Sequence, residues 1–212
     1  MLKRLVQLAV AALMLLIAAS ALAQTDLARG TNEFSIWGGF SPNSPRNIGV
    51  TGDRKLFTLN VQYDRVLFTT GSVAWKYMGE IVPVALITQH PETIMLPGGG
   101  TQTLGSNKTV YGAGLTPLGA QCNFLRTRKV QPFLNAQGGF LYFTDQVPVV
   151  NSSQFNFTFS FGAGVQIFRG NRNALTLGYR YHHLSNDETA PRNPGVDSNL
   201  FYVGYSWLWR KK

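Results

Sequence analysis

Between residues 154 and 168 the side chains alternate strictly between apolar and polar. One set of alternate positions holds Phe155, Phe157, Phe159, Phe161, Ala163, Val165 and Ile167. The other set holds Asn156, Thr158, Ser160, Gly162, Gly164 and Gln166. Because successive side chains of a β-strand point to opposite faces, this pattern predicts a strand with one apolar and one polar face. Residues 57–64 repeat the pattern, so the sheet as a whole is expected to have two unlike faces.

Almost no segment after residue 32 has helical periodicity, and the alternation instead predicts eight strands. These strands span residues 33–41, 55–68, 73–87, 109–124, 130–143, 154–168, 174–185 and 197–209. Short turns alternate along the chain with longer connections that are rich in Gly, Pro, Asn and Ser. Short turns at one end and long loops at the other are typical of an outer-membrane barrel. The predicted fold is therefore all-β, an eight-stranded antiparallel barrel in the bacterial outer membrane.

The alternation alone leaves a second architecture open, a soluble eight-stranded calyx with an apolar interior. The loop asymmetry and the aromatic strand faces favour the membrane barrel, with a polar lumen and a possible Glu80–Arg180 ion pair. In this register the lumen receives Asp64, Lys76, Glu80, Asn135, Gln137, Gln166, Arg180 and His182. The expected interfacial aromatic residues are Trp75, Tyr77, Tyr202, Tyr205, Trp207 and Trp209.

The first 23 residues have the form of a bacterial signal peptide. Lys3 and Arg4 precede an apolar run, and Ala21-Leu22-Ala23 is a small-x-small cleavage pattern. Residues 24–212 then form one barrel domain, with 17 cationic against 10 acidic side chains. A basic chain suits an anionic partner. For an exported barrel we expect anionic lipid head groups in that role, and no nucleic acid.

Cysteine and histidine are too scarce for two common kinds of site. A single cysteine, Cys122, excludes an internal disulfide framework. With three histidines besides, the sequence offers no credible metal cluster, and we expect no metal and no cofactor.

Polar residues with catalytic chemistry interrupt the apolar faces of the last two strands. His183 and Ser185 continue the face of Leu175, Leu177, Tyr179 and Tyr181, about 6.6 Å apart along the strand. Asp197 opens the next strand with matching parity, after an eleven-residue loop, so an antiparallel hairpin returns it close to them. A serine needs a base to become nucleophilic, and a histidine base needs an acid to orient it. The three residues therefore predict a Ser-His-acid site facing lipid.

The loop between these strands supplies further candidates. Asn186 and Asn193 are expected donors to the oxyanion that forms during acyl transfer. Asp187 and Glu188 are rival acids, although they follow Ser185 directly and would need the chain to fold back. In the outer loops, Arg46, Arg54 and Arg192 are candidates to meet phosphate groups, and the alternative interpretation of each is a solvated loop charge.

The run His183-Leu184-Ser185-Asn186, followed by Asn193-Pro194-Gly195-Val196-Asp197, resembles the lipid A 3-O-deacylases of Gram-negative outer membranes. The resemblance implies an eight-stranded barrel with His183 as base, Ser185 as nucleophile and Asp197 as acid. It also implies Asn193 as the side-chain donor to the oxyanion, and hydrolysis of the 3-hydroxyacyl ester at position 3 of lipid A without a cofactor. The expected partner is lipid A, or lipopolysaccharide, in the outer leaflet.

The chain departs from the family pattern in two places. The acid of this chain is an aspartate, whereas glutamate is usual in the family. The chain also ends Trp209-Arg210-Lys211-Lys212, whereas an aromatic residue is common at the end of such barrels. Two other functions stay open on the sequence, a non-catalytic barrel such as an adhesin or envelope-stability protein, and an esterase for another envelope lipid. The sequence leaves the oligomeric state open.

Overall fold

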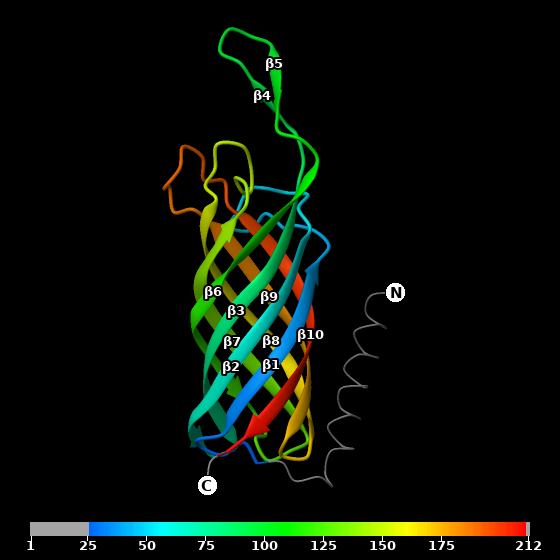
Figure 1. The fold of residues 1–212 in the computed structure, drawn as a ribbon, viewed down its shortest axis with the longest axis vertical. Coiled ribbons are helices and arrows are strands. Elements are labelled where there is room, and N and C mark those ends of the chain that lie inside the picture. Colours follow the sequence, from blue (N-terminus) through cyan, green and yellow to red (C-terminus); the bar gives the residue numbers. More distant parts are fainter. Residues whose placement is uncertain (1–25, 211–212) are drawn as a thin grey trace.

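A computed structural model describes residues 26–210, so the expected signal peptide at residues 1–23 lies outside the described residues. The chain forms a closed antiparallel barrel of eight strands (Figure 1). The barrel strands are β1 (Asn32–Ser41), β2 (Leu56–Thr70), β3 (Val73–Gln89), β6 (Lys108–Asn123), β7 (Val130–Phe143), β8 (Phe155–Arg169), β9 (Asn173–Ser185) and β10 (Val196–Trp209). Pairing of β1 with β10 closes the barrel and leaves it without a free edge.

The two ends of the barrel differ. Long loops join the strands at one end, and a separate hairpin of β4 (Glu92–Met95) and β5 (Thr101–Leu104) extends beyond them (Figure 1). Short turns join the strands at the other end, where β1 begins and β10 ends. The eight predicted strands are thus confirmed, and the hairpin inside the predicted loop 88–108 is an addition. Within residues 26–210 no helix has the length and apolar character that spanning a membrane requires.

The exposure of side chains on the two faces of the barrel wall shows that the outer face is apolar and the inner face polar. In β8 the side chains of Asn156, Thr158 and Ser160 are buried inside, whereas Phe159 and Phe161 are 40% and 53% exposed on the outer wall. An apolar exterior around a polar interior is the arrangement that hydrocarbon surroundings require. It excludes the soluble calyx, which would have the opposite polarity.

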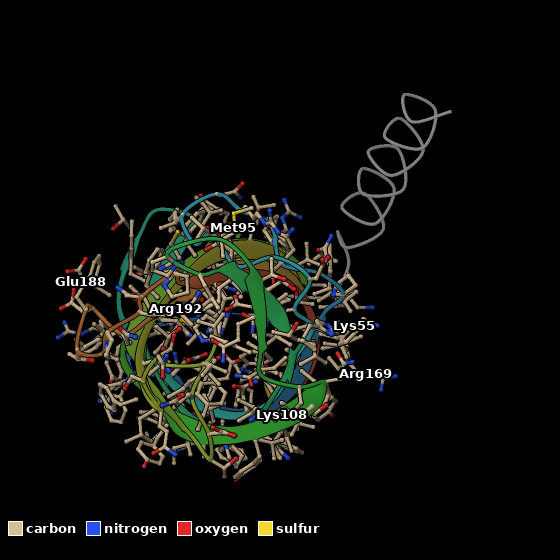
Figure 2. All side chains as sticks on the ribbon, turned by 90° about the horizontal axis from the view of Figure 1, so that it is seen from above. Lys55, Met95, Lys108, Arg169, Glu188 and Arg192 are labelled. Atoms are coloured by element: carbon tan, nitrogen blue, oxygen red, sulfur yellow. The ribbon has the colours of Figure 1, made fainter. Side chains whose placement is uncertain are left out.

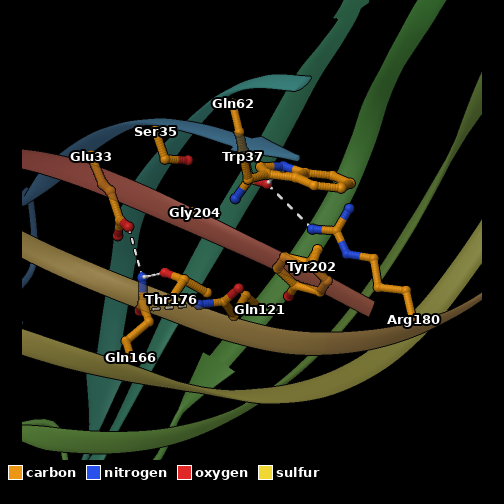
Figure 3. Close-up of a pocket in the computed structure, with 10 residues that line it drawn as sticks. All are labelled: Glu33, Ser35, Trp37, Gln62, Gln121, Gln166, Thr176, Arg180, Tyr202 and Gly204. Carbon is orange, nitrogen blue, oxygen red and sulfur yellow. Dashed lines mark hydrogen bonds between the residues drawn. The ribbon is translucent and has the colours of Figure 1, made fainter. Parts of the chain in front are cut away.

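The lumen is filled by paired polar side chains. The expected ion pair of Arg180 with Glu80 is confirmed at 3.2 Å, and Lys76 binds Glu33 at 2.5 Å. The Arg180 guanidinium also lies 4.5 Å from the centre of the Trp37 ring (Figure 3). Two lumen cavities measure about 10 and 20 Å³, which is room for single waters and not for a channel. The eight polar residues expected to point inward lie buried or half-buried.

One expected interfacial residue belongs to the lumen. Tyr202 is 7% exposed and packs its ring 4.9 Å from that of Trp37. Its even position in β10 points it inward, opposite to Trp207 and Trp209, which are each 44% exposed on the outer wall. The prediction that Tyr202 lies in an aromatic belt is therefore wrong, because strand parity places it inside.

Two prolines lie where the ladder shifts register. Pro83 lies in the shift of the β3–β6 pairing between Val82 and Ala85, and Pro117 lies in that of β6–β7 between Leu115 and Leu118. Each leaves a carbonyl on the outer wall that a neighbouring tyrosine satisfies. Tyr111 donates its hydroxyl to Pro83 O and Tyr77 donates to Pro117 O, both at 2.7 Å. An unpaired carbonyl facing hydrocarbon would cost several kcal/mol, so these bonds make both irregularities tolerable.

Candidate active site

The site lies on the outer wall, where β9 and β10 reach the long-loop end. Asp197 stands directly across from His183 in the antiparallel register, and both side chains point outward. His183 Nδ1 and Asp197 Oδ1 are 2.6 Å apart. Although they point away from the lumen, His183 is 6% exposed and Asp197 is fully buried. A buried imidazole–carboxylate pair on an apolar wall needs a cover and further hydrogen bonds.

The loop between β1 and β2 supplies that cover. Three consecutive backbone N–H groups donate to the Asp197 carboxylate, from Asn47 at 2.8 Å, Ile48 at 2.9 Å and Gly49 at 3.1 Å. Charge-assisted bonds of this kind offset the cost of burying the carboxylate. Together with Nδ1 of His183, these three amides surround the carboxylate with four donors, which fix its orientation.

Sequence reasoning missed this loop because its donors are backbone groups, which no side chain marks. The close approach of this loop to β10 depends on Gly49. A Cβ at this position would lie 2.7 Å from both Gly195 C and Val196 N, so only glycine lets the loop approach the start of β10 so closely. Gly195, at φ +60°, would likewise place a Cβ 3.0 Å from His183 Cε1.

Ser185 lies two positions beyond His183 on the same outward face and is half-buried. Within residues 26–210 the Ser185 hydroxyl makes no hydrogen bond to the imidazole. Since Nδ1 of His183 is held by Asp197, the nitrogen left for Ser185 is Nε2. Hydrogen bonds between catalytic groups are commonly long in the absence of substrate. The Phe159 ring, 5.1 Å from the imidazole ring, borders the site on β8.

The two asparagines of the connecting loop contact each other. Asn186 donates its backbone N–H to Asn193 Oδ1 at 3.0 Å and its side-chain Nδ2 to Arg192 O at 2.8 Å. Asn186 is 1% exposed, and both of its donors thus serve the loop. The bond to Oδ1 orients the Asn193 amide, whose Nδ2 makes no hydrogen bond within the described part of the chain.

Within residues 26–210 neither rival acid makes a hydrogen bond or ion pair with the imidazole of His183. Asp187 and Glu188 are exposed and adopt positive φ angles of 50° and 58° in the turn after β9. Seen along the barrel axis, Glu188 projects from the rim of the molecule (Figure 2). His182, the neighbour of His183, points into the lumen, where its Nε2 lies 2.7 Å from Thr158 Oγ1.

The three loop arginines differ in their surroundings. Arg54 is 4% exposed and donates to Gly52 O at 3.1 Å, and burial lowers the pKa of its guanidinium. Arg192 pairs with Glu92 of β4 at 2.8 Å, which ties the loop of Asn193 to the hairpin. The expectation that Arg54 meets a phosphate is therefore wrong, because its guanidinium is buried against backbone carbonyls. Arg46 is exposed.

Known structures with similar folds are outer-membrane barrels. The crystal structure of the outer membrane enzyme PagL superposes with a TM-score of 0.54 at 14% identity, covering 82% of this chain and 97% of that one. The outer membrane protein OprG from Pseudomonas aeruginosa gives a TM-score of 0.50 at 12% identity, covering 88% of this chain and 100% of the other. No curated protein matches the sequence. At these identities the likeness concerns the fold.

The sequence itself carries the family assignment. Residues 93–206, more than half of the chain, match the family described as lipid A 3-O-deacylase (PagL). The matched segment runs from the hairpin through β10 and includes every candidate catalytic residue. With the barrel architecture, it places the protein in the bacterial outer membrane. The chain belongs to the lipid A 3-O-deacylase (PagL) family.

Proposed function

We propose that the protein is an outer-membrane esterase that removes the 3-hydroxyacyl chain from position 3 of lipid A, with Ser185, His183 and Asp197 as its catalytic residues. One observation carries the proposal, the His183–Asp197 pair buried on the lipid-facing wall. Ionisable groups at membrane depth are costly and are typically retained for function. A structural pair would not require an outward position where three amides of a separate loop must cover it.

The position of the pair supports a lipid substrate. Long loops mark the extracellular end of an outer-membrane barrel. His183 and Ser185 are the last outward residues of β9 before such a loop, so they lie at the depth of the outer leaflet, where lipid A resides. The apolar wall beside them is suited to the acyl chains of the substrate.

The proposed reaction follows from the roles of the three side chains. Ser185 Oγ attacks the ester carbonyl carbon while its proton passes to His183 Nε2. The tetrahedral intermediate collapses, the bond to the sugar oxygen breaks, and that oxygen takes the proton from Nε2. Water then attacks the acyl-serine in the same way, Ser185 regains its proton, and the 3-hydroxy fatty acid leaves. Asp197 holds the ring with its proton on Nδ1 throughout, and no cofactor is needed.

The negative charge of the tetrahedral intermediate needs a donor. Asn193 is proposed for this role, because its Oδ1 is held by the Asn186 N–H and its Nδ2 remains for the oxyanion. Asn186 then acts through Asn193, as a positioning residue.

Mass spectrometry of lipid A tests the proposal directly. Lipid A is extracted from an outer membrane that contains the wild-type barrel and from one that contains Ser185→Ala. We expect the wild-type protein to remove one ester-linked hydroxyacyl chain and Ser185→Ala to remove none. Unchanged lipid A beside a folded wild-type barrel would favour a non-catalytic barrel, and loss of a chain from another envelope lipid would favour a different esterase.

A further inference from the structure

The charged residues of the described chain are distributed unevenly between the two ends of the barrel. The long loops and the strand ends beside them carry five cationic and six acidic side chains. Outside the lumen, the short-turn end carries eight cationic side chains and one carboxylate, that of Asp26, which is paired with Arg126. The cationic residues of this end are Arg29, Arg65, Arg126, Arg128, Lys129, Arg169, Arg172 and Arg210. The cationic excess of the barrel therefore lies at its periplasmic rim, opposite to Ser185.

Three of these arginines line one hollow in the outer wall. Arg29 precedes β1, Arg65 lies in β2 and Arg210 follows β10, and the register brings them together because Asn32 of β1 pairs with both Arg65 and Trp209. The hollow measures about 390 Å³. It is lined by Arg29, Gly30, Asn32, Tyr63, Arg65, Trp209 and Arg210.

Hydrogen bonds hold the floor of the hollow in place. Asn32 is 6% exposed, and its Oδ1 accepts the Tyr63 hydroxyl at 2.7 Å and Arg65 Nη1 at 3.4 Å. Within residues 26–210, Arg29, Arg65 and Arg210 form no ion pair with a carboxylate. The hollow therefore gathers three guanidinium groups that the described chain leaves without a counter-ion.

Two aromatic residues on the lipid-facing wall flank the hollow. Tyr63 and Trp209 are 38% and 44% exposed on the lipid-facing wall, and their ring centres are 6.4 Å apart. Aromatic residues of a barrel wall gather at the membrane interface, at the level of the head groups. An anion bound between them thus has apolar surface beside it as well as positive charge.

We propose that this hollow binds the phosphate head group of an anionic glycerophospholipid in the periplasmic leaflet. A planar guanidinium can donate two parallel hydrogen bonds to a phosphate. The three arginines of the hollow can approach one phosphate from different sides. Tyr63 and Trp209 would lie against the glycerol backbone and the upper acyl chains. The site lies at the opposite end of the barrel from Ser185, so the proposal stands independently of the esterase assignment.

Native mass spectrometry of the full barrel in detergent tests this binding. Phosphatidylglycerol and phosphatidylcholine with the same acyl chains are offered to the wild-type protein and to Arg29→Gln/Arg65→Gln/Arg210→Gln. The matched control is Arg128→Gln/Lys129→Gln/Arg172→Gln, which removes the same charge from the same end and spares the hollow. We expect the wild-type protein and the control to prefer phosphatidylglycerol, and the first variant to bind it about tenfold more weakly.

Three results would overturn the proposal. One is equal binding of the two lipids by the wild-type barrel, and another is an equal loss of binding in the two triple variants. The third is displacement of the lipid by excess glycerol phosphate, which would show a site for the free anion. Circular dichroism establishes that each variant is folded, and Arg210→Gln alone, a change beyond the last strand, replaces the triple variant if that variant does not fold.

Discussion

At the residue scale, the Asp197 carboxylate gives the sharpest prediction. Asp197→Asn keeps the shape of the side chain but gives it an amide in place of one oxygen, in a space where three N–H groups and His183 require acceptors. The imidazole then loses the partner that keeps its proton on Nδ1. We expect kcat for lipid A deacylation to fall by about 10⁴, as for other triads whose aspartate is replaced by asparagine.

The rival acids provide the controls for this measurement. Asp187→Ala and Glu188→Ala change exposed side chains and are expected to leave kcat within about twofold, as surface substitutions usually do. A loss for Glu188→Ala as large as that for Asp197→Asn would contradict the assignment of the acid. Asp197→Glu is expected to be destabilising by about 1–3 kcal/mol, because the enclosed carboxylate leaves no room for another methylene.

Strand parity was enough to predict the outward face shared by His183, Ser185 and Asp197, because alternation along a strand is a local property. The 2.6 Å contact between His183 and Asp197 needed the register of two strands, which the sequence suggested only through the length of the loop. The amides of residues 47–49 lie about 150 positions away and have no side-chain pattern, so the sequence could not predict them.

At the element scale, the β1–β2 loop is predicted to control catalysis without supporting the barrel. Gly49→Ala places a methyl group 2.7 Å from backbone atoms of Gly195 and Val196, which must push the loop away from Asp197. We expect kcat to fall about tenfold or more, since small displacements of catalytic groups are costly. The strand content and the unfolding midpoint in urea should change little, because the loop lies outside the strand ladder.

A matched substitution separates this effect from the general cost of replacing glycine. Gly138→Ala lies in β7 on the outer wall, where the nearest atom to the new methyl group is Thr158 O at 3.8 Å. It should leave both kcat and the unfolding midpoint unchanged. Full activity of Gly49→Ala would show that the loop amides do not position the acid.

The tyrosines beside the two prolines give a second prediction at this scale. Removing the hydroxyl in Tyr77→Phe or Tyr111→Phe leaves a carbonyl at a register shift without its donor. Each change is expected to lower the free energy of unfolding by about 1–3 kcal/mol, as for a buried acceptor that loses its partner. Urea unfolding in lipid vesicles measures this, with Tyr205→Phe as a control whose hydroxyl makes no hydrogen bond in the described chain.

The strands themselves were predictable to within two residues at either end, because alternation over ten or more positions is a strong local signal. The β4–β5 hairpin was not, because Pro97 and the glycines at 98–100 are typical of an irregular loop. Its strands are four residues long, too short for alternation to be read. The register shifts at Pro83 and Pro117 depend on neighbouring strands, and no single segment encodes them.

At the scale of the whole molecule, the closed lumen makes the barrel a packed body and not a pore. Arg180 joins Glu80 of β3, Gln62 of β2, Trp37 of β1 and Tyr202 of β10, and so connects strands on different sides of the barrel. The alternation along the strands predicted polar residues inside, and it also allowed the Glu80–Arg180 pair to be anticipated. It did not predict that Trp37 and Tyr202 would enclose the guanidinium, because large aromatic residues suggest the outer wall of such a barrel.

This central pair is predicted to be strongly coupled in the folding of the barrel. Arg180→Met leaves the Glu80 carboxylate buried without its cation, and Glu80→Gln leaves the guanidinium without its anion. Each single change is expected to lower the free energy of unfolding by about 3–5 kcal/mol, whereas the double variant should recover much of that loss. Urea unfolding in lipid vesicles of the wild-type protein, the two single variants and the double variant completes the double-mutant cycle. If the two losses in free energy of unfolding simply add in the double variant, the 3.2 Å contact contributes no coupling. The lumen would then be stabilised by its other hydrogen bonds.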